Sequence, residues 1–203
     1  MVDVTPYQPL SELDLTKEAK RPNLVVAGAT FISAILFAAY GALTALYVAE
    51  RAEVISTGEV WLPDGVTIPL TQPNYMGLSM LFSFVCIWWA RSAAANGDRS
   101  NAMLAQGMTL LFGFGFVVQS FYLFTLLELN PQESLQAVLI VAMAGVQLVL
   151  TLAGLVAIAL NLFRTVVGDF DGERYEAVTA VAIYWTAVAS IYGVLWYTIY
   201  ITK

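Results

Sequence analysis

Histidine is missing from this 203-residue chain, and cysteine occurs only once, as Cys86. Without histidine, the chain lacks the commonest metal ligand and the usual acid–base group at neutral pH. One cysteine cannot form an internal disulfide or a cysteine metal cluster. Charged residues make up only 12% of the chain. These absences weigh against an enzyme acting alone, because acid–base catalysis needs a titratable group within reach of the substrate.

Hydrophobic residues make up 59% of the sequence, and its mean hydropathy is +0.73. This composition predicts a small integral membrane protein. The net charge of −6 argues against nucleic acid as a partner, because nucleic acid is bound mainly through lysine and arginine. No cleavable signal peptide is expected, because residues 1–24 are polar and the first apolar run after them is long enough to span a membrane.

The sequence predicts an all-α membrane protein with five transmembrane helices. A bilayer core needs roughly 20 apolar residues in helical form, and five segments qualify or nearly do. The predicted helices of the membrane domain, residues 25–203, are 25–49, 75–91, 102–127, 135–163 and 177–202. An external loop is predicted over 50–74, where prolines favour turns. Residues 1–24 form a cytoplasmic tail with either a short surface helix or a solvated, partly disordered chain.

The distribution of lysine and arginine predicts which way the helices cross. With the N-terminus in the cytoplasm, seven of the nine basic residues lie on the cytoplasmic side: Lys17, Lys20, Arg21, Arg91, Arg99, Arg164 and Arg174. The outer side keeps only Arg51 and Lys203. This asymmetry follows the positive-inside rule, so the N-terminus is expected inside and the C-terminus outside.

The predicted spans contain no acidic residue, and Arg91 only closes the second of them. Intramembrane charge usually marks a transport or proton path, so its scarcity speaks against a transporter or proton relay. The remaining polar residues are predicted to hydrogen-bond between helices, a substrate path being the alternative. They are Ser33, Gln106, Gln119, Gln147, Thr151, Asn161, Thr186 and Ser190. Gly113 and Gly115 are predicted to let another helix approach closely.

Several short blocks, taken in order, resemble one family. They are "LTALYVAERA" (43–52), the loop "VWLPDGVTIPL", "NYMGLSMLFSF" after it, "TLLFGFGFVVQSFY" with Gln119, "LAGLVAIALNLFRT" with Arg164, and "YWTAVASIYGVLWYTIYITK". Together with the helix number and direction, they resemble subunit III of the haem-copper terminal oxidases (cytochrome c oxidase), in its short five-helix bacterial form. The resemblance extends from about residue 22 to 203 and implies location in the bacterial cytoplasmic (inner) membrane.

The chain departs from the family at its titratable positions. By the resemblance, the buried glutamates of the family fall on Leu36 and Tyr122. Its paired histidines fall on Gln147 and Leu150, and the histidine and aspartate of its last helix fall on Thr186 and Ala189. Any role that depends on protonation inside the subunit is therefore not expected here.

The resemblance implies a non-catalytic subunit of a respiratory oxidase. Such a subunit has no cofactor of its own, and haem and copper are expected in partner subunits. It packs against a catalytic subunit I-like membrane protein and other subunits, and it holds phospholipid. An alternative is a paralogue serving as scaffold or assembly subunit of another membrane oxidoreductase, such as a nitric oxide reductase or a copper membrane monooxygenase. A small-solute transporter is a further alternative, although the spans lack a mid-span proline.

Lipid contact is predicted at three residues. Arg164, at the cytoplasmic end of the fourth span, is expected to meet an anionic headgroup, because basic residues at helix ends bind headgroups. Tyr184 and Trp185 lie well inside the last span, where anchoring at the membrane interface does not account for them. They are expected to line a cleft for an acyl chain. The alternative for Arg164 is that its side chain simply reaches to water.

Overall fold

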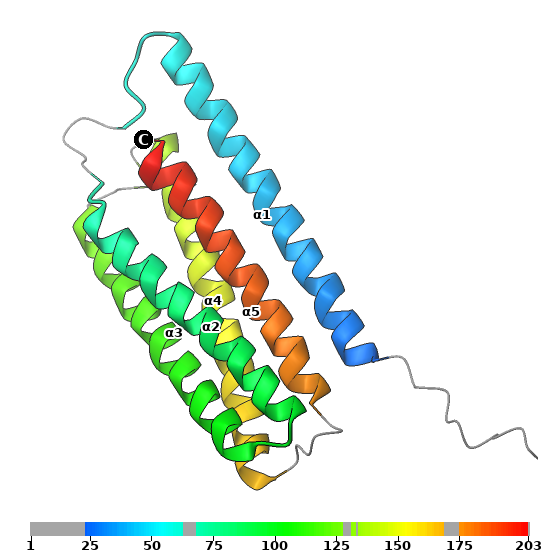
Figure 1. Cartoon of the computed structure of the whole chain (residues 1–203). Helices are drawn as coiled ribbons and strands as arrows, with labels where there is room; N and C mark the ends of the chain where they lie inside the picture. The colour runs from blue at the N-terminus through cyan, green and yellow to red at the C-terminus, as the bar shows by residue number, and fades with distance from the viewer. Residues whose placement is uncertain (1–22, 63–67, 128–130, 133, 169–174, 203) are drawn as a thin grey trace, which may run out of the picture.

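The computed structural model describes residues 23–62, 68–127, 131–132, 134–168 and 175–202. Within these residues the chain consists of five long helices and no strand (Figure 1). The helices are α1 (Leu24–Ser56), α2 (Thr71–Ala95), α3 (Arg99–Leu127), α4 (Leu135–Val167) and α5 (Glu176–Leu195). All five are long and apolar enough to cross a membrane. The protein is therefore a multi-pass helical membrane protein, as the sequence predicted.

The helices run beyond the apolar segments that predicted them. α1 continues for seven residues past residue 49, through Glu50, Arg51 and Glu53, into the predicted external loop. α2 begins at Thr71 and ends at Ala95, so it is longer at both ends than the predicted 75–91. A helix satisfies its own backbone in water as well as in lipid, so it need not end where hydrophobicity ends. The possible surface helix of the N-terminal tail lies outside the described residues.

The last helix changes its hydrogen bonding near its end. After Leu195 the chain forms a π-helix over Trp196–Ile201, and the Thr202 amide donates to the carbonyl of Tyr197 five residues earlier. The sequence predicted an uninterrupted helix over 177–202. Three consecutive residues of the wider π-helix, Thr198 to Tyr200, are buried. π-Helical turns of this kind are frequent at functional sites.

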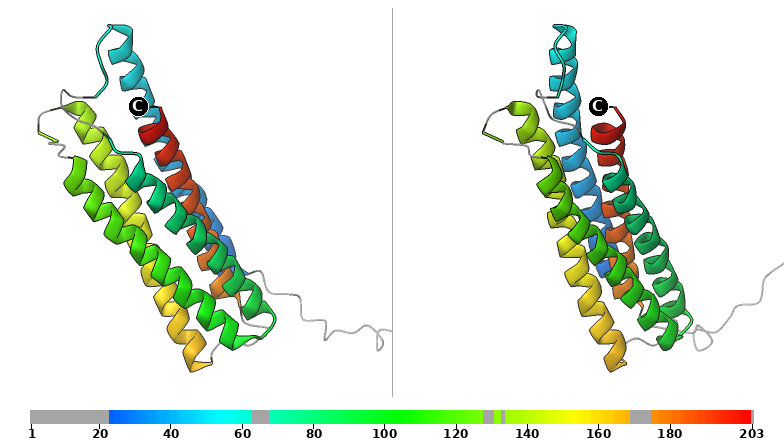
Figure 2. Two further views of the ribbon diagram at one scale, coloured as in Figure 1. Left: turned by 60° about the vertical axis from the view of Figure 1, so that its left-hand side comes forward. Right: turned by 90° about the vertical axis from the view of Figure 1, so that its left-hand side faces the viewer.

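Four of the helices form a ring, and α1 lies outside it. α2 packs on α3, α3 on α4, α4 on α5, and α5 back on α2. α1 packs mainly along α5 and only slightly on α4. The views in Figures 1 and 2 show α1 along one side of the molecule, with its C-terminal end extending past the ends of the other helices. α5 thus packs against three neighbours, α1, α2 and α4.

The centre of the ring is the indole of Trp185 on α5, which is completely buried. Its Nε1 donates a hydrogen bond to Ser83 Oγ on α2 at 3.0 Å. Its ring fills the space left by Gly154 of α4, where a Cβ atom would lie 2.7 Å from ring carbons. At Gly113 of α3, a Cβ would lie 3.1 Å from the same ring. One side chain thus contacts the other three helices of the ring, and two of those contacts need glycine.

Polar groups close the ends of the helices. Asp98 Oδ1 accepts from the Asn101 amide at 3.0 Å at the start of α3. The hydrogen bonds that the backbone and the side chain of Asn101 make with Asp98 lower the pKa of the Asp98 carboxyl from its ordinary value. Gly168 ends α4 in the left-handed conformation with a φ of 88°. Arg99 then covers this end, because its guanidinium donates to the carbonyls of Thr165 and Val166.

Replacing Gly154 with alanine is predicted to destabilise the bundle, because the new methyl group collides with the rigid Trp185 ring. Overpacking of this kind costs about 1–3 kcal/mol. We expect a lower thermal midpoint, measured by circular dichroism in mild detergent. Gly145→Ala on the same helix is the matched control, because nothing lies within 4 Å of its added Cβ. Equal midpoints for the two variants would contradict the predicted clash at Trp185.

Candidate functional site

Three glutamines tie neighbouring helices together in the ring. Gln106 Nε2 donates to Thr165 Oγ1 at 2.9 Å and joins α3 to α4. Gln119 Nε2 donates to Ser79 Oγ at 3.2 Å and joins α3 to α2. Gln147 Nε2 donates to the carbonyl of Val188 at 3.2 Å and joins α4 to α5. The prediction that these glutamines bond between helices is therefore confirmed, and such bonds hold helices together within lipid.

Two further interhelical bonds involve residues that the sequence analysis had singled out. Asn161 Nδ2 donates to the carbonyl of Ala177 at 3.1 Å, from α4 to the start of α5. Thr186 Oγ1 accepts from Trp88 Nε1 at 3.0 Å, from α5 to α2. By the resemblance, Gln147 and Thr186 stand where the family has histidines. Both positions therefore hold neutral groups that bond between helices.

The glutamine network leaves some acceptors unused. The Oε1 atoms of Gln106, Gln119 and Gln147 are buried and have no hydrogen-bond partner among the described residues. Gln147 also lines a small internal cavity of about 10 Å³, together with Ser120, Tyr192 and Tyr200. Each glutamine thus uses its amide donor across a helix boundary while its carbonyl contributes no bond of this kind. The three glutamine bonds hold neighbouring helices together.

The half of the bundle near the start of α2 is closed by aromatic side chains. Trp61, from the segment after α1, donates its Nε1 to Tyr47 Oη at 2.9 Å, and their rings meet edge to face at 5.2 Å between centroids. Tyr192 donates to the carbonyl of Pro73 at 2.5 Å, which joins α5 to the start of α2. Tyr40 on α1 donates to the carbonyl of Met143 on α4 at 3.4 Å. The polar groups of these tyrosines and of this tryptophan therefore hydrogen-bond within the chain.

The structure places the three predicted lipid residues in different surroundings. Trp185 lies at the centre of the ring without exposed surface, and it has none to offer an acyl chain in this arrangement. Tyr184 is half-buried and donates to the carbonyl of Leu150 at 2.8 Å. Arg164 is exposed near the end of α4, on an open cavity of about 430 Å³ with Phe163, Val167 and Gly168.

These three residues do not form one compact site. Leu150, which Tyr184 contacts, and Arg164 are fourteen residues apart on α4, or about 21 Å along the helix at 1.5 Å per residue. A single lipid reaches both only if it runs along α4 from one end. The structure brings Tyr184 and Trp185 together around Gly154, since a Cβ there would meet both rings.

Sequence reasoning missed several residues that the structure makes important. Ser83, the acceptor for Trp185, lies in an apolar stretch in which nothing marks one serine above another. Trp88 was passed over in the same way. It donates a hydrogen bond to Thr186, and the guanidinium carbon of Arg91 lies 5.4 Å from the centroid of its ring. Arg99 was used only as a marker of membrane orientation. The sequence did contain one signal for this role. Gly168 marks the C-terminus of a helix, and an arginine near a helix C-terminus can bind its last carbonyls.

No group of three or more histidine, cysteine, aspartate or glutamate side chains comes together to hold a metal ion in the described part of the chain. Among the described residues, the buried polar side chains are those of serine, threonine, asparagine and glutamine, and the buried aromatic residues include tryptophans and tyrosines. These groups are suited to helix packing and to contact with neutral or anionic ligands.

Comparison with known proteins agrees with this architecture. The protein class, a multi-pass helical membrane protein, follows from the fold. The family model for cytochrome c oxidase subunit III matches residues 23–203. The chain therefore belongs to the cytochrome c oxidase subunit III family, whose members are accessory subunits of an oxidase complex.

Cytochrome c oxidase subunit 3 of several fishes is similar to this chain. The chain is 26% identical over 172 residues to cytochrome c oxidase subunit 3 of Oncorhynchus clarkii and 25% identical to that of Gadus morhua. It is 24% identical to the subunit 3 of Carassius auratus. Each alignment covers 84% of this chain but only 66% of the relative. The chain thus spans about two thirds of the length of the relatives that it matches.

Replacing Ser83 with alanine is predicted to destabilise the bundle, because it leaves the buried Trp185 N–H without an acceptor. An unsatisfied buried donor costs about 1–3 kcal/mol. We expect the variant to unfold at a lower concentration of denaturing detergent than the parent protein. Ser190→Ala is the control, because the Ser190 hydroxyl is exposed and bonds only to its own helix, at Thr186. If both variants unfold like the parent protein, the Ser83–Trp185 bond does not support the fold.

Proposed function

We propose that this chain is a non-catalytic subunit of a respiratory haem-copper oxidase complex in a bacterial cytoplasmic membrane. It packs beside the catalytic subunit and itself carries no haem or copper, which belong to partner subunits. Its N-terminus lies in the cytoplasm and its C-terminus on the outer side. Membership of the subunit III family is the observation that carries this proposal. The neutral, interhelically bonded interior supports it, because that interior is built for packing.

The outward face of α1 is the surface that we propose for docking. α1 buries only three residues, Ser33, Tyr40 and Tyr47, against its own chain. Gly41 and Ala45 are both exposed, and a Cβ at Gly41 meets nothing within 4 Å. Small residues let a second helix approach closely within a membrane, where packing drives association. A helix of the catalytic subunit is the partner that this face would accept.

The proposal predicts that affinity purification in mild detergent recovers the chain together with larger membrane subunits that contain haem and copper. Optical spectra for haem and elemental analysis for copper are the readouts. Recovery as a monomer without any metal-containing partner contradicts the proposal. Recovery with non-haem iron and haem, or with copper alone, points instead to a nitric oxide reductase or a copper monooxygenase.

We also propose that Arg164 binds the headgroup of an anionic phospholipid. It is exposed at the end of α4 beside two strongly exposed apolar side chains, Phe163 at 69% and Val167 at 83%. This arrangement suits a lipid, because a cation meets the headgroup while apolar side chains meet the acyl chains. Tyr184 belongs to the same lipid-facing side of α4 and α5 in this proposal. Trp185 supports Tyr184 through their shared contact with Gly154.

Replacing Arg164 with alanine is predicted to reduce the anionic phospholipid that co-purifies with the protein, because the headgroup loses its cation. Arg164→Lys is the matched control and is expected to retain most of it, since the positive charge stays at the same helix end. Quantitative lipid analysis by mass spectrometry is the measurement. An unchanged lipid content in the alanine variant removes Arg164 from the proposed site.

A further inference from the structure

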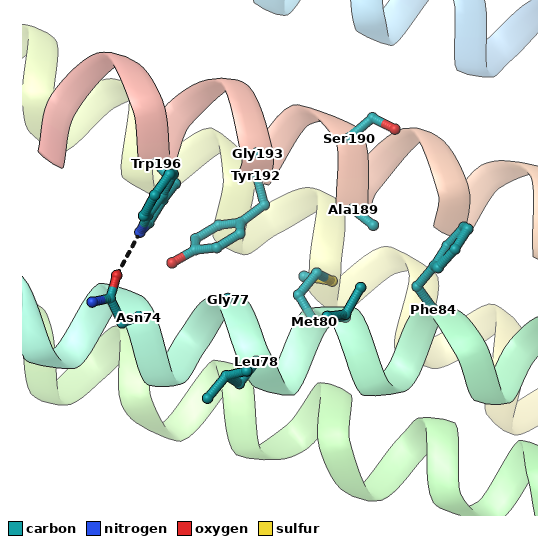
Figure 3. Close-up of a pocket in the computed structure, with 11 residues that line it drawn as sticks. Asn74, Gly77, Leu78, Met80, Phe84, Ala189, Ser190, Tyr192, Gly193 and Trp196 are labelled. Carbon is teal, nitrogen blue, oxygen red and sulfur yellow. Dashed lines mark hydrogen bonds between the residues drawn. The ribbon is translucent and has the colours of Figure 1, made fainter. Parts of the chain in front are cut away.

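Tyr192 lines two hollows of the bundle, one open and one internal. The open one, the α2–α5 groove, has a volume of about 710 Å³ and lies between these two helices. Figure 3 shows Tyr192 in it, reaching from α5 toward α2 beside the Trp196–Asn74 hydrogen bond of 2.9 Å. The internal one is the cavity of about 10 Å³ that Gln147 also lines. The side chain of Tyr192 is thus a wall that the groove and the internal cavity share.

The internal cavity gathers polar side chains from separate elements. Ser120 comes from α3, Gln147 from α4, Tyr192 from α5 and Tyr200 from the π-helix that follows it. All four are buried, and Gln147 is only 2% exposed. The other described residues that line the cavity are apolar, and none of the lining residues is charged. A polar hollow of this kind is suited to a small neutral ligand that forms hydrogen bonds.

The orientation of the Gln147 amide is fixed by its partner on α5. Its Nε2 donates to the carbonyl of Val188 at 3.2 Å. A carbonyl only accepts hydrogen bonds, so the amide cannot be turned around without losing this bond. The Oε1 atom of Gln147 is buried and has no hydrogen-bond partner among the described residues. Burial of an acceptor without a donor is costly, so this position favours a donor from outside the chain.

Two hydroxyls in the cavity cannot supply that donor, because their hydrogens are already engaged. Ser120 Oγ donates to the carbonyl of Phe116 at 2.8 Å. Tyr192 Oη donates to the carbonyl of Pro73 at 2.5 Å. Each hydroxyl has one hydrogen to donate but can still accept. Acceptors are therefore in excess around Gln147, and a ligand with two hydrogens to donate complements them.

We propose that one water molecule is bound in this cavity. It donates to Gln147 Oε1 and to the hydroxyl of Ser120 or Tyr192, and it accepts from the hydroxyl of Tyr200. A buried water needs a space of about 10–15 Å³ and roughly two to four polar partners, and the cavity offers about 10 Å³ and four such side chains. An ion would be without a counter-charge there, because none of the lining side chains is charged.

The bound water gives the π-helix at the end of the chain a role. Tyr200 belongs to the π-helix Trp196–Ile201, in which Thr198 to Tyr200 are all buried. π-Helical turns are frequent at functional sites, because they redirect side chains. Through the water, Tyr200 is connected to α4 at Gln147. This inference concerns only the interior of the chain and does not depend on which complex the chain joins.

The test is electron cryomicroscopy of the protein as it purifies from membranes, at a resolution that shows ordered water. A density peak within hydrogen-bond distance of Gln147 Oε1 is expected in the parent protein and absent from Tyr200→Phe, which removes one hydroxyl. Tyr197→Phe is the matched control and is expected to keep the peak, because Tyr197 is in the same π-helix but is 60% exposed and outside the cavity. A parent map that shows other buried waters but not this one overturns the proposal, as does a peak that Tyr200→Phe retains unchanged.

Unfolding in denaturing detergent gives a second measurement. Tyr200→Phe is expected to unfold at a lower detergent concentration than Tyr197→Phe, because it leaves Gln147 Oε1 without a donor. The same change made in Gln147→Met is expected to have a smaller effect than in the parent, since that variant has no such acceptor. Gln147 Oε1 has no direct partner among the described residues, so this coupling reports the water. Equal effects of Tyr200→Phe in both backgrounds overturn the proposal, and if Gln147→Met does not fold, the density decides alone.

Discussion

The indole of Trp185 determines how closely four helices approach one another. Its N–H bonds Ser83 on α2, and its ring occupies the space that Gly113 and Gly154 leave on α3 and α4. Within lipid, apolar surface gains little by meeting other apolar surface, so close packing and hydrogen bonds must hold helices together. Trp185 supplies both at once, from a helix that packs against α1, α2 and α4. The interhelical bonds of Gln106, Gln119 and Gln147 then connect the helix pairs around it.

A neutral interior has a consequence for where this protein can act. The bonds that hold the ring together use amides, hydroxyls and indoles, and titration in the physiological range does not change such groups. The surfaces of the described chain that are open to other molecules include the exposed face of α1, the α2–α5 groove and the end of α4. This division suits a subunit that packs beside a catalytic partner and holds lipid, as the proposed function requires.

Three arginines at one end of the bundle show how surroundings decide the role of a residue. Arg99 bonds the last carbonyls of α4 and so serves the fold. Arg91 lies over the ring of Trp88, and its Nε has no hydrogen-bond partner among the described residues. Arg164 is exposed beside apolar side chains at the end of α4. In the sequence, Arg91 and Arg99 were only counts in a charge asymmetry, whereas Arg164 was also predicted to contact lipid.

The number of spans and the all-helical class were predictable, because apolar runs of sufficient length leave a helix as the economical way to satisfy the backbone in lipid. The glutamine bonds were predictable in kind but not in partner. The helix ends, the π-helix at Trp196, the burial of Trp185 and the Arg99 cap were not predictable. Each depends on residues that meet only after folding, such as Ser83 and Trp185, which are 102 positions apart. Local composition thus determined the elements, whereas contacts between distant residues decided which side chains face the core, a lipid or a partner.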